Sequence, residues 1–507
     1  MKQLITLLFV LLATTTVAQV DGFEEFRRKA ESAFNAARES HDNRFEQHRA
    51  EINRRYADHI RNVWSRYDVS PSEPEPTRPD PVEPPVYTPP TLPAERPTAD
   101  KPAPQPAPQP VPQPITVPAK PAPQPKPQPK PQPAPQPVVK PAVQPTAPQQ
   151  PTVAFEFYGT QVELRTPGTG IPSLFALSED VVANSWLAIS KGGFDVMLED
   201  CLAIKKSIGM GDWGYYCLVR DAATCYYGAQ CNDNTLLQAY ILTHSGFRLR
   251  LARKENRLYM LLNVSETIYG QPFFTLDGAR YYFVESRVAP QSLQICNVQF
   301  PGEKGLSLQM TAPPRLAQRD AASIRFASTR YPELFVTLAP NKNLIDFYAS
   351  YPTSPLSFYV HTSLSPALKD VLYPALKRAT AQRPQREAVD VVLNFVQTAF
   401  AYKSDTYQFG REKWFFGDEM FFYPFCDCDD RAILFAVLVR EVLGLDVVLL
   451  DYPEHISTAV RIPAAGDDGV VTVDGERYVI CDPTYINAGV GRVMSGLDSS
   501  KLKIVKL

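Results

Sequence analysis

The chain has 507 residues, a formal net charge of -2, and an unusually large number of prolines, 50. This length corresponds to about two to four domains, and the near-neutral charge gives no basis for nucleic-acid binding. The prolines, the 8 cysteines and the 6 histidines are unevenly distributed, so their positions carry more information than their numbers.

Residues 1–19 have the pattern of a secretory signal peptide. Lys2 gives a positive start, residues 4–12 are apolar, and small residues lead to a cleavage zone at Val17-Ala18-Gln19. The apolar run is too short to cross a bilayer. The mature chain is therefore expected to be exported, to the periplasm or outside the cell, and to have no transmembrane segment.

Residues 20–69 are predicted to form one long amphipathic helix. Apolar residues from Phe23 to Tyr67 recur at helical spacing among charged residues, and Pro71 ends the pattern. The apolar stripe is narrow, as in a coiled coil, so we expect the helix to pack on a partner or on itself.

Residues 70–151 form a proline-rich tract with repeats such as KPAPQPKPQPKPQP. Proline fixes φ and removes backbone donors, so an extended polyproline-type linker is expected rather than a packed core. The tract either acts as a spacer or serves as a ligand for a proline-binding partner.

Two globular segments follow. Residues 152–289 have the mixed signals of an α/β domain: WGYYCLVRDAATCYYGAQ and the stretch before Gly246 are helical, and strands follow, one of them after the Asp277-Gly278 turn. Residues 290–384 are expected to be a small β-rich domain with a connecting helix, and its strands would be LSLQM, SIRFAS, LFVTLAP and LSFYVH. Export permits disulfides among Cys201, Cys217, Cys225, Cys231 and Cys296, and the pairing stays open.

Residues 385–507 contain the stretch FCDCDDRAILFA, with Cys426 and Cys428 before an apolar helix that Gly444 ends. Asp429 and Asp430 suit the first turn of that helix. A helix N-terminus stabilises a thiolate, so Cys428 is predicted to be the better nucleophile of the two cysteines.

Candidates for a base and an orienting acid, His455 and Asp482, follow Cys428 at equal spacing along the chain. His455 opens a predicted strand, and Asp482 ends a hairpin that turns at Asp474-Gly475. These positions suit a catalytic triad of Cys428, His455 and Asp482. The alternatives are a metal clip or a disulfide at Cys426 and Cys428, or a structural role for a buried His455. No nucleotide loop, calcium loop or zinc spacing is present, so no cofactor and no metal are expected.

The blocks CDDRAILFAVLVREVLGL, HISTAV and CDPTYINA, with the lead-in NFVQTAFAYKSDTYQFGREKWFFGDE, resemble the transglutaminase-like superfamily over roughly residues 388–490. The resemblance implies an α+β, papain-like core in residues 385–507, with Cys428 as nucleophile, His455 as base and Asp482 as orienter. It also implies acyl transfer through a thioester. Cys426 is a departure from the motif, and it leaves redox control or the other choice of nucleophile open.

The favoured function is hydrolysis of a polypeptide or peptide-like amide. The backbone N–H of Cys428 would help to bind the oxyanion, and the candidates for a second donor are Gln408, Trp414 and Tyr423. The alternatives are a non-catalytic binding scaffold on the same fold and an amine-transferring cross-linker.

The segment CNDNTLLQAYILTHSGFRLRLA, from Cys231, has the same order of cysteine, helix, glycine and strand as the segment from Cys428. No histidine stands at the place that matches His455, where the sequence is RLYMLLNV, and Val284-Glu285 stands where Asp482-Pro483 would be. Residues 152–289 are therefore either a degenerate repeat of the same core, retained for binding or support, or a chance recurrence of the pattern.

Overall fold

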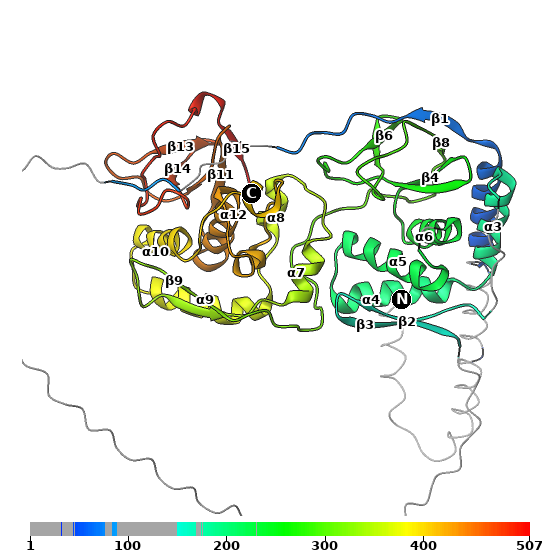
Figure 1. Ribbon diagram of the computed structural model, residues 1–507, viewed down its shortest axis with the longest axis horizontal. Coiled ribbons are helices and arrows are strands. Elements are labelled where there is room, and N and C mark those ends of the chain that lie inside the picture. The colour runs from blue at the N-terminus through cyan, green and yellow to red at the C-terminus, as the bar shows by residue number, and fades with distance from the viewer. Residues whose placement is uncertain are drawn as a thin grey trace, which may run out of the picture. The chain divides into compact units, whose positions relative to one another are not determined.

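The computed structural model describes residues 32, 44, 46–76, 84–88, 150–168, 174, 176–229 and 231–507 (Figure 1). The predicted signal peptide, the first part of the predicted helix and most of the proline-rich tract lie outside these residues. Of the described residues, all except residue 88 belong to one compact unit. Within the described ranges no helix has the length and apolar character needed to cross a membrane.

The chain has a mixed α and β architecture, as expected. The first part of the main unit holds the hairpin β2 (Thr152–Phe157) and β3 (Thr160–Arg165), the helices α3 (Glu179–Lys191), α4 (Asp195–Ile208), α5 (Asp212–Tyr227) and α6 (Asn232–His244), and the strands β1 (Ser65–Asp68), β4 (Leu249–Lys254), β5 (Arg257–Leu262), β6 (Phe273–Leu276), β7 (Ala279–Tyr282) and β8 (Ser292–Cys296). These strands form one antiparallel sheet in the order β1-β8-β4-β5-β7-β6, and α6 packs on β4 and β5.

The second part begins with the hairpin β9 (Ile324–Ala327) and β10 (Phe335–Leu338) and the helices α7 (Lys342–Tyr348), α8 (Leu356–His361), α9 (Pro366–Thr380), α10 (Gln385–Thr398) and α11 (Asp405–Phe409). It continues with η2 (Gly417–Phe421), α12 (Cys428–Leu438), η3 (Val439–Leu443), β11 (Val447–Asp451), β12 (Ile456–Val460), β13 (Val470–Val473), β14 (Glu476–Cys481), η4 (Ser499–Lys501) and β15 (Lys503–Val505). The sheet order is β13-β14-β12-β11-β15, and α12 packs on β11 and β12.

The two sheets share one topology. The order β8-β4-β5-β7-β6 corresponds strand for strand to β15-β11-β12-β14-β13, with every neighbouring pair antiparallel. The helix before each sheet packs on the same two strands and ends at a glycine with positive φ, Gly246 or Gly444. The first sheet differs by one added strand, β1, at its β8 edge.

The region predicted to be β-rich has fewer strands than expected. SIRFAS and LFVTLAP form β9 and β10, but LSFYVH is the helix α8, and LSLQM makes only an isolated bridge at Leu306. Leu356, Phe358, Tyr359 and Val360 are all buried. A short segment that is apolar on all sides has no periodicity that separates a strand from a buried helix, which explains the wrong prediction for LSFYVH.

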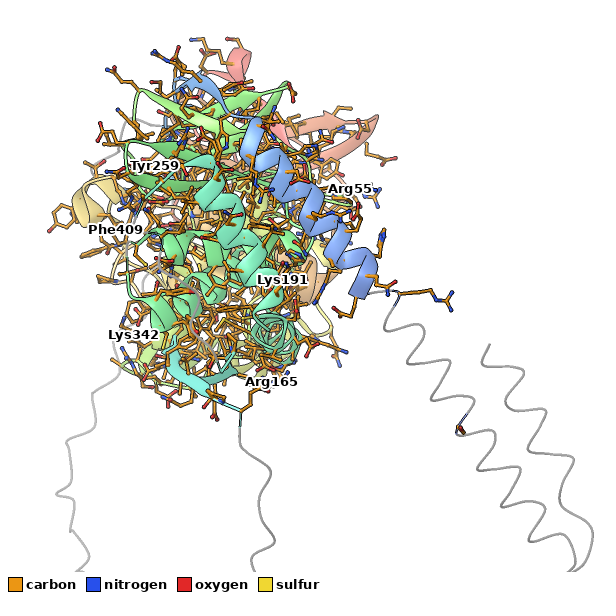
Figure 2. All side chains as sticks on the ribbon, turned by 90° about the vertical axis from the view of Figure 1, so that its right-hand side faces the viewer. Arg55, Arg165, Lys191, Tyr259, Lys342 and Phe409 are labelled. Carbon is orange, nitrogen blue, oxygen red and sulfur yellow. The ribbon has the colours of Figure 1, made fainter. Side chains whose placement is uncertain are left out.

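The predicted N-terminal helix ends earlier than Tyr67. Its described part, residues 46–62, is helical, whereas Ser65–Asp68 pairs with β8 as β1. The helix packs on its own chain beside α3: Trp186 Nε1 donates to Asn53 Oδ1 at 2.9 Å, and the rings of Tyr56 and Trp186 are 4.7 Å apart. Figure 2 shows this helix alongside α3 with Arg55 pointing outward.

The described ends of the proline-rich tract are docked on the main unit. The backbone carbonyl of Glu73 accepts from Gly270 N, and Glu75 pairs with Arg287 at 2.8 Å. Further along, Val86 makes a parallel bridge with Ile486. At least these residues are bound in extended form rather than acting as a free spacer.

Candidate active site

Cys428 is the first residue of α12, as predicted. Asp427 caps the helix: its carboxylate accepts from Asp429 N at 3.2 Å, while the Asp430 carboxylate accepts from Asp427 N at 3.2 Å. This reciprocal capping fixes the entry into the helix and therefore the position of Cys428. The Cys428 side chain is 6% exposed, and its thiol lies 3.7 Å from Asp429 Oδ1.

His455 and Asp482 are brought together by the sheet. His455 immediately precedes β12, Asp482 immediately follows β14, and these strands pair through Thr458 and Cys481. His455 Nε2 lies 2.9 Å from Asp482 Oδ2, with both side chains buried. Because α12 packs on β12, the helix that begins at Cys428 lies against the strand that follows His455.

The carboxylate of Asp482 is held in its charged form. Burial would raise the pKa of Asp482, but the neighbouring His455 and two backbone donors outweigh it, so the pKa lies below its usual value. The donors are Thr484 N at 2.9 Å and Tyr485 N at 3.1 Å, both to Oδ1. Oδ2 is thereby left to orient His455.

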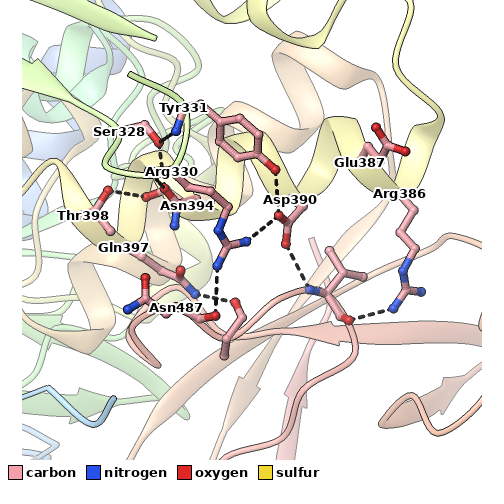
Figure 3. Close-up of polar contacts among 12 residues, drawn as sticks. Ser328, Arg330, Tyr331, Arg386, Glu387, Asp390, Asn394, Gln397, Thr398 and Asn487 are labelled. Atoms are coloured by element: carbon pink, nitrogen blue, oxygen red, sulfur yellow. Dashed lines mark hydrogen bonds and ion pairs between the residues drawn. The ribbon is translucent and has the colours of Figure 1, made fainter. Parts of the chain in front are cut away.

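A polar face of α10 holds the loop that carries Asp482 (Figure 3). Gln397 Nε2 lies within 2.8–2.9 Å of the carbonyl oxygens of Asp482, Tyr485 and Ala488, and its two hydrogens can serve two of them at a time. Arg330 connects the same loop to Asp390 of α10 through the carbonyl of Asn487. Gln397 was not predicted from the sequence. The sequence does contain a signal for it, since Gln397 is an amide in the mostly apolar helical stretch VVLNFVQT, and a buried amide needs hydrogen-bond partners.

The Cys426 thiol is buried and bonded to its surroundings. It lies 3.5 Å from the Ala401 carbonyl, accepts from Arg431 Nε at 3.5 Å, and is 2% exposed. Burial raises the pKa of Cys426, with Arg431 acting in the opposite direction. The sulfur forms no disulfide with Cys428, and all eight cysteines, including the five whose pairing was left open, have free thiols.

The three proposed oxyanion donors occupy different places. Gln408 clamps the backbone of Phe425, since its amide both donates to the Phe425 carbonyl and accepts from Phe425 N, each at 3.2 Å. Trp414 Nε1 donates to Asp429 Oδ2 at 2.9 Å, beside Cys428. Tyr423 packs its ring against Phe415. A role as second donor stays a prediction for all three, and Trp414 is the one bonded to a neighbour of Cys428.

The oxygens of Asp427 and Asp429 and the sulfur of Cys428 lie within 4.8 Å of one another, which is close enough for one cation. The carboxylates are already engaged, however. Asp427 accepts from Asp429 N and Asp405 N, and Asp429 accepts from Trp414 and the Cys428 thiol. A bound cation would have to displace these donors, so the cluster is better explained as the cap that shapes the start of α12.

Buried carboxyl groups behind this cap predict a pH-dependent stability. Burial raises the pKa of Asp405 and of Glu412 to about 8 each. An unfolded carboxyl titrates near about 4, so the folded chain binds more protons between about pH 4 and 8, and the free energy of unfolding falls as pH rises through that window. The slope is at most about 1.4 kcal/mol per pH unit for each group.

Urea unfolding at pH 5, 6.5 and 8 measures this effect. Asp405→Asn should flatten the slope. Asp468→Asn is the matched control, because the Arg386 pair lowers the pKa of Asp468, and its effect should be uniform over the same range. Equal slopes for wild type and Asp405→Asn would contradict the assignment.

Comparison with protein-family models, curated proteins and solved structures finds no match for this chain.

Proposed function

We propose that the chain is a cysteine hydrolase of peptide or amide bonds, on a papain-like core of the transglutaminase-like type. The observation that carries the proposal is the buried hydrogen bond between His455 Nε2 and Asp482 Oδ2, beside the helix that Cys428 opens. A histidine oriented by a charged acid next to a cysteine at a helix N-terminus is the arrangement that nucleophilic catalysis needs.

The contact between His455 Nε2 and Asp482 Oδ2 supports one role for each ring nitrogen in this proposal. Asp482 accepts the hydrogen of Nε2, so Nδ1 of His455 is the atom that takes the thiol proton of Cys428. The sulfur attacks the amide carbonyl carbon, and the resulting oxyanion is stabilised by the backbone N–H of Cys428 and a second donor. The C–N bond breaks as His455 returns the proton to the leaving amine, which leaves a thioester on Cys428.

Water completes the cycle. His455 removes a proton from a water molecule, the hydroxide attacks the thioester carbon, and the carboxylic acid product and the Cys428 thiol are released. An amine that enters in place of water would give a cross-linked product, so the same intermediate serves both reactions.

A cavity of about 400 Å³ is a suitable entry for the substrate. It lies beside the turn that leads into His455, and Trp414, Tyr269, Tyr452, Leu356, Lys503 and Pro76 are among the residues that line it. Trp414 connects it to the first turn of α12 through Asp429. Its aromatic walls suit a peptide side chain better than a small polar metabolite.

The test is incubation of the purified full chain with a peptide library from a digested proteome, with and without an added primary amine, followed by mass spectrometry. New amino termini or conversion of glutamine to glutamate indicates hydrolysis, and amine adducts indicate transfer. Products must disappear with Cys428→Ala. If wild type and Cys428→Ala give the same peptides, the binding scaffold becomes the better account.

A further inference from the structure

The strand register of the two sheets can be compared residue by residue. The hairpins turn at Asp277-Gly278 and Asp474-Gly475, all four with positive φ. Counting from these turns, the pair Leu262 and Tyr282 corresponds to the pair Val460 and Val479. Leu262 then pairs with Leu249, just as Val460 pairs with Val447. The turn and these two strand pairings together carry the alignment from β7 and β14 to β4 and β11.

The helices agree with this alignment. Gly246 and Gly444 stand at the same distance before Leu249 and Val447, the first residues of β4 and β11. The stretch from Cys428 to Gly444 has one residue more than the stretch from Cys231 to Gly246, and it ends in the π-helical turn η3, which is how a helix absorbs an inserted residue. Cys231 therefore lies within one position of the place of Cys428: it is the N-cap of α6, whereas Cys428 is the first residue of α12, after the N-cap Asp427.

The same register puts Arg257 in the place of His455 and Glu285 in the place of Asp482, one residue beyond the Val284 expected there from the sequence. Arg257 Nη2 lies 3.0 Å from Glu285 Oε2, which reproduces the contact between His455 and Asp482. A guanidinium stays protonated and cannot remove a proton from a thiol. Where the C-terminal segment has a histidine that can act as a base, residues 152–289 have an arginine in an ion pair with Glu285.

A large cavity surrounds this ion pair. It has a volume of about 1100 Å³ and is lined in part by Arg257, Glu285, Tyr216, Asn234, Gln238 and Tyr259. In the C-terminal copy, residues 399–427 lie between α10 and α12 and bring Trp414 and Cys426 against the start of α12. Only residues 228–231 separate α5 from α6, so the corresponding space is uncovered.

The C-terminal copy also shows what lies against the loop that follows the acidic residue of the triad position. Beyond Asp482, the backbone of Ile486 donates to the Pro85 carbonyl and accepts from Tyr87 N, each at 2.8 Å. An extended proline-containing segment therefore pairs with the loop that follows Asp482. The matching residues beyond Glu285 are Val288, Ala289 and Pro290. They line the cavity, and Val288 is 81% exposed.

We propose that residues 152–289 are a second copy of the C-terminal core, in which the cavity at the former triad position binds an extended, proline-containing peptide along Val288–Ala289. Val288 N is already bonded to Ser286 Oγ, so the peptide main chain would pair with the backbone of Ala289, the counterpart of Ile486. Tyr259 (Figure 2), which lines the cavity, gives an aromatic surface on which a proline ring can pack. This function does not depend on catalysis at Cys428.

The proposed equivalence of Arg257 with His455 and of Glu285 with Asp482 is tested by building a triad around Cys231. The background is the full chain with Cys428→Ala. Adding Arg257→His and Glu285→Asp should raise the rate of iodoacetamide alkylation of Cys231 at pH 7 by about tenfold or more. The matched control carries Arg257→Gln with Glu285→Asp. Equal rates of Cys231 alkylation in the two variants would overturn the proposed equivalence, provided that both have the thermal melting temperature of a folded chain.

Binding is tested separately with a fluorescein-labelled peptide of residues 84–90, PPVYTPP, added to the Cys428→Ala chain. Fluorescence anisotropy should show saturable binding that Tyr259→Ala or Gln238→Leu weakens by about tenfold. Tyr485→Ala, at the C-terminal edge, should leave this binding unchanged. Equal binding of a Gly-Ser peptide, or loss of binding only with Tyr485→Ala, would overturn the proposal.

Discussion

Cys428→Ser is expected to reduce amide hydrolysis by about 10³-fold or more, because a serine hydroxyl in this site is a far weaker nucleophile than a thiolate. The change removes no packing volume of consequence, so thermal stability should stay close to that of wild type. The rate of product formation from any cleaved library peptide, followed by mass spectrometry, measures the effect.

Cys426→Ser is the matched control for this prediction. The two cysteines stand one residue apart and are both buried, but Cys426 binds Arg431 and the Ala401 carbonyl. A hydroxyl can keep these contacts, so activity should be retained within a few-fold. Loss of activity with Cys426→Ser and retention with Cys428→Ser would show that the nucleophile is Cys426.

Asp482→Asn is expected to reduce hydrolysis by about 10³- to 10⁴-fold. The amide cannot stabilise a protonated His455, so the thiolate and imidazolium pair forms less readily. The pH at which Cys428 becomes reactive should therefore move upward. The pH dependence of its alkylation separates this effect from a general loss of structure, which would lower the reactivity at every pH.

Asp468→Asn is the control for Asp482→Asn. Asp468 is in the same part of the chain and has a buried side chain, but it pairs with Arg386 rather than with His455. Its replacement should lower stability without moving the pH profile of Cys428. An equal shift of the profile in both variants would contradict a specific action of Asp482 through His455.

The places of Cys428, His455 and Asp482 in the fold were predictable from the sequence because these residues lie at element boundaries. Cys428 begins a helix, His455 precedes a strand and Asp482 follows one, and each boundary is marked by glycine, proline or aspartate. The supporting residues were not predictable in this way. Gln397 and Arg431 act from inside apolar helices, and only the tertiary structure shows which carbonyls they reach.

Elements of the fold that depend on local sequence were predicted correctly, and elements that depend on tertiary contacts were not. Hairpins with Asp-Gly turns were predicted correctly, since their turn chemistry is local. Residues 65–68 were assigned to a helix by periodicity, although pairing with β8 makes them a strand. The buried helix α8 was assigned as a strand. In both places tertiary contacts override the local pattern.

The shared topology of the two sheets has a consequence for evolution within this chain. If residues 152–289 are a second copy of the core, the copy with the insertion 399–427 kept the chemistry, and the copy without it kept an open cavity. The insertion supplies Trp414, Asp405 and Glu412, which bury the start of α12. The proposed catalysis, which needs water to be removed from the nucleophile, would therefore belong to the covered copy.

Thiol reactivity tests the central claim most directly. The full chain is treated with limiting iodoacetamide between pH 5 and 9, and the alkylation of each cysteine is quantified by mass spectrometry for wild type and His455→Ala. The account predicts that Cys428 is alkylated fastest at or below pH 7 and that His455→Ala slows it by about tenfold or more. Alkylation of Cys428 at the same rate in both proteins, or faster alkylation of Cys426, would contradict it.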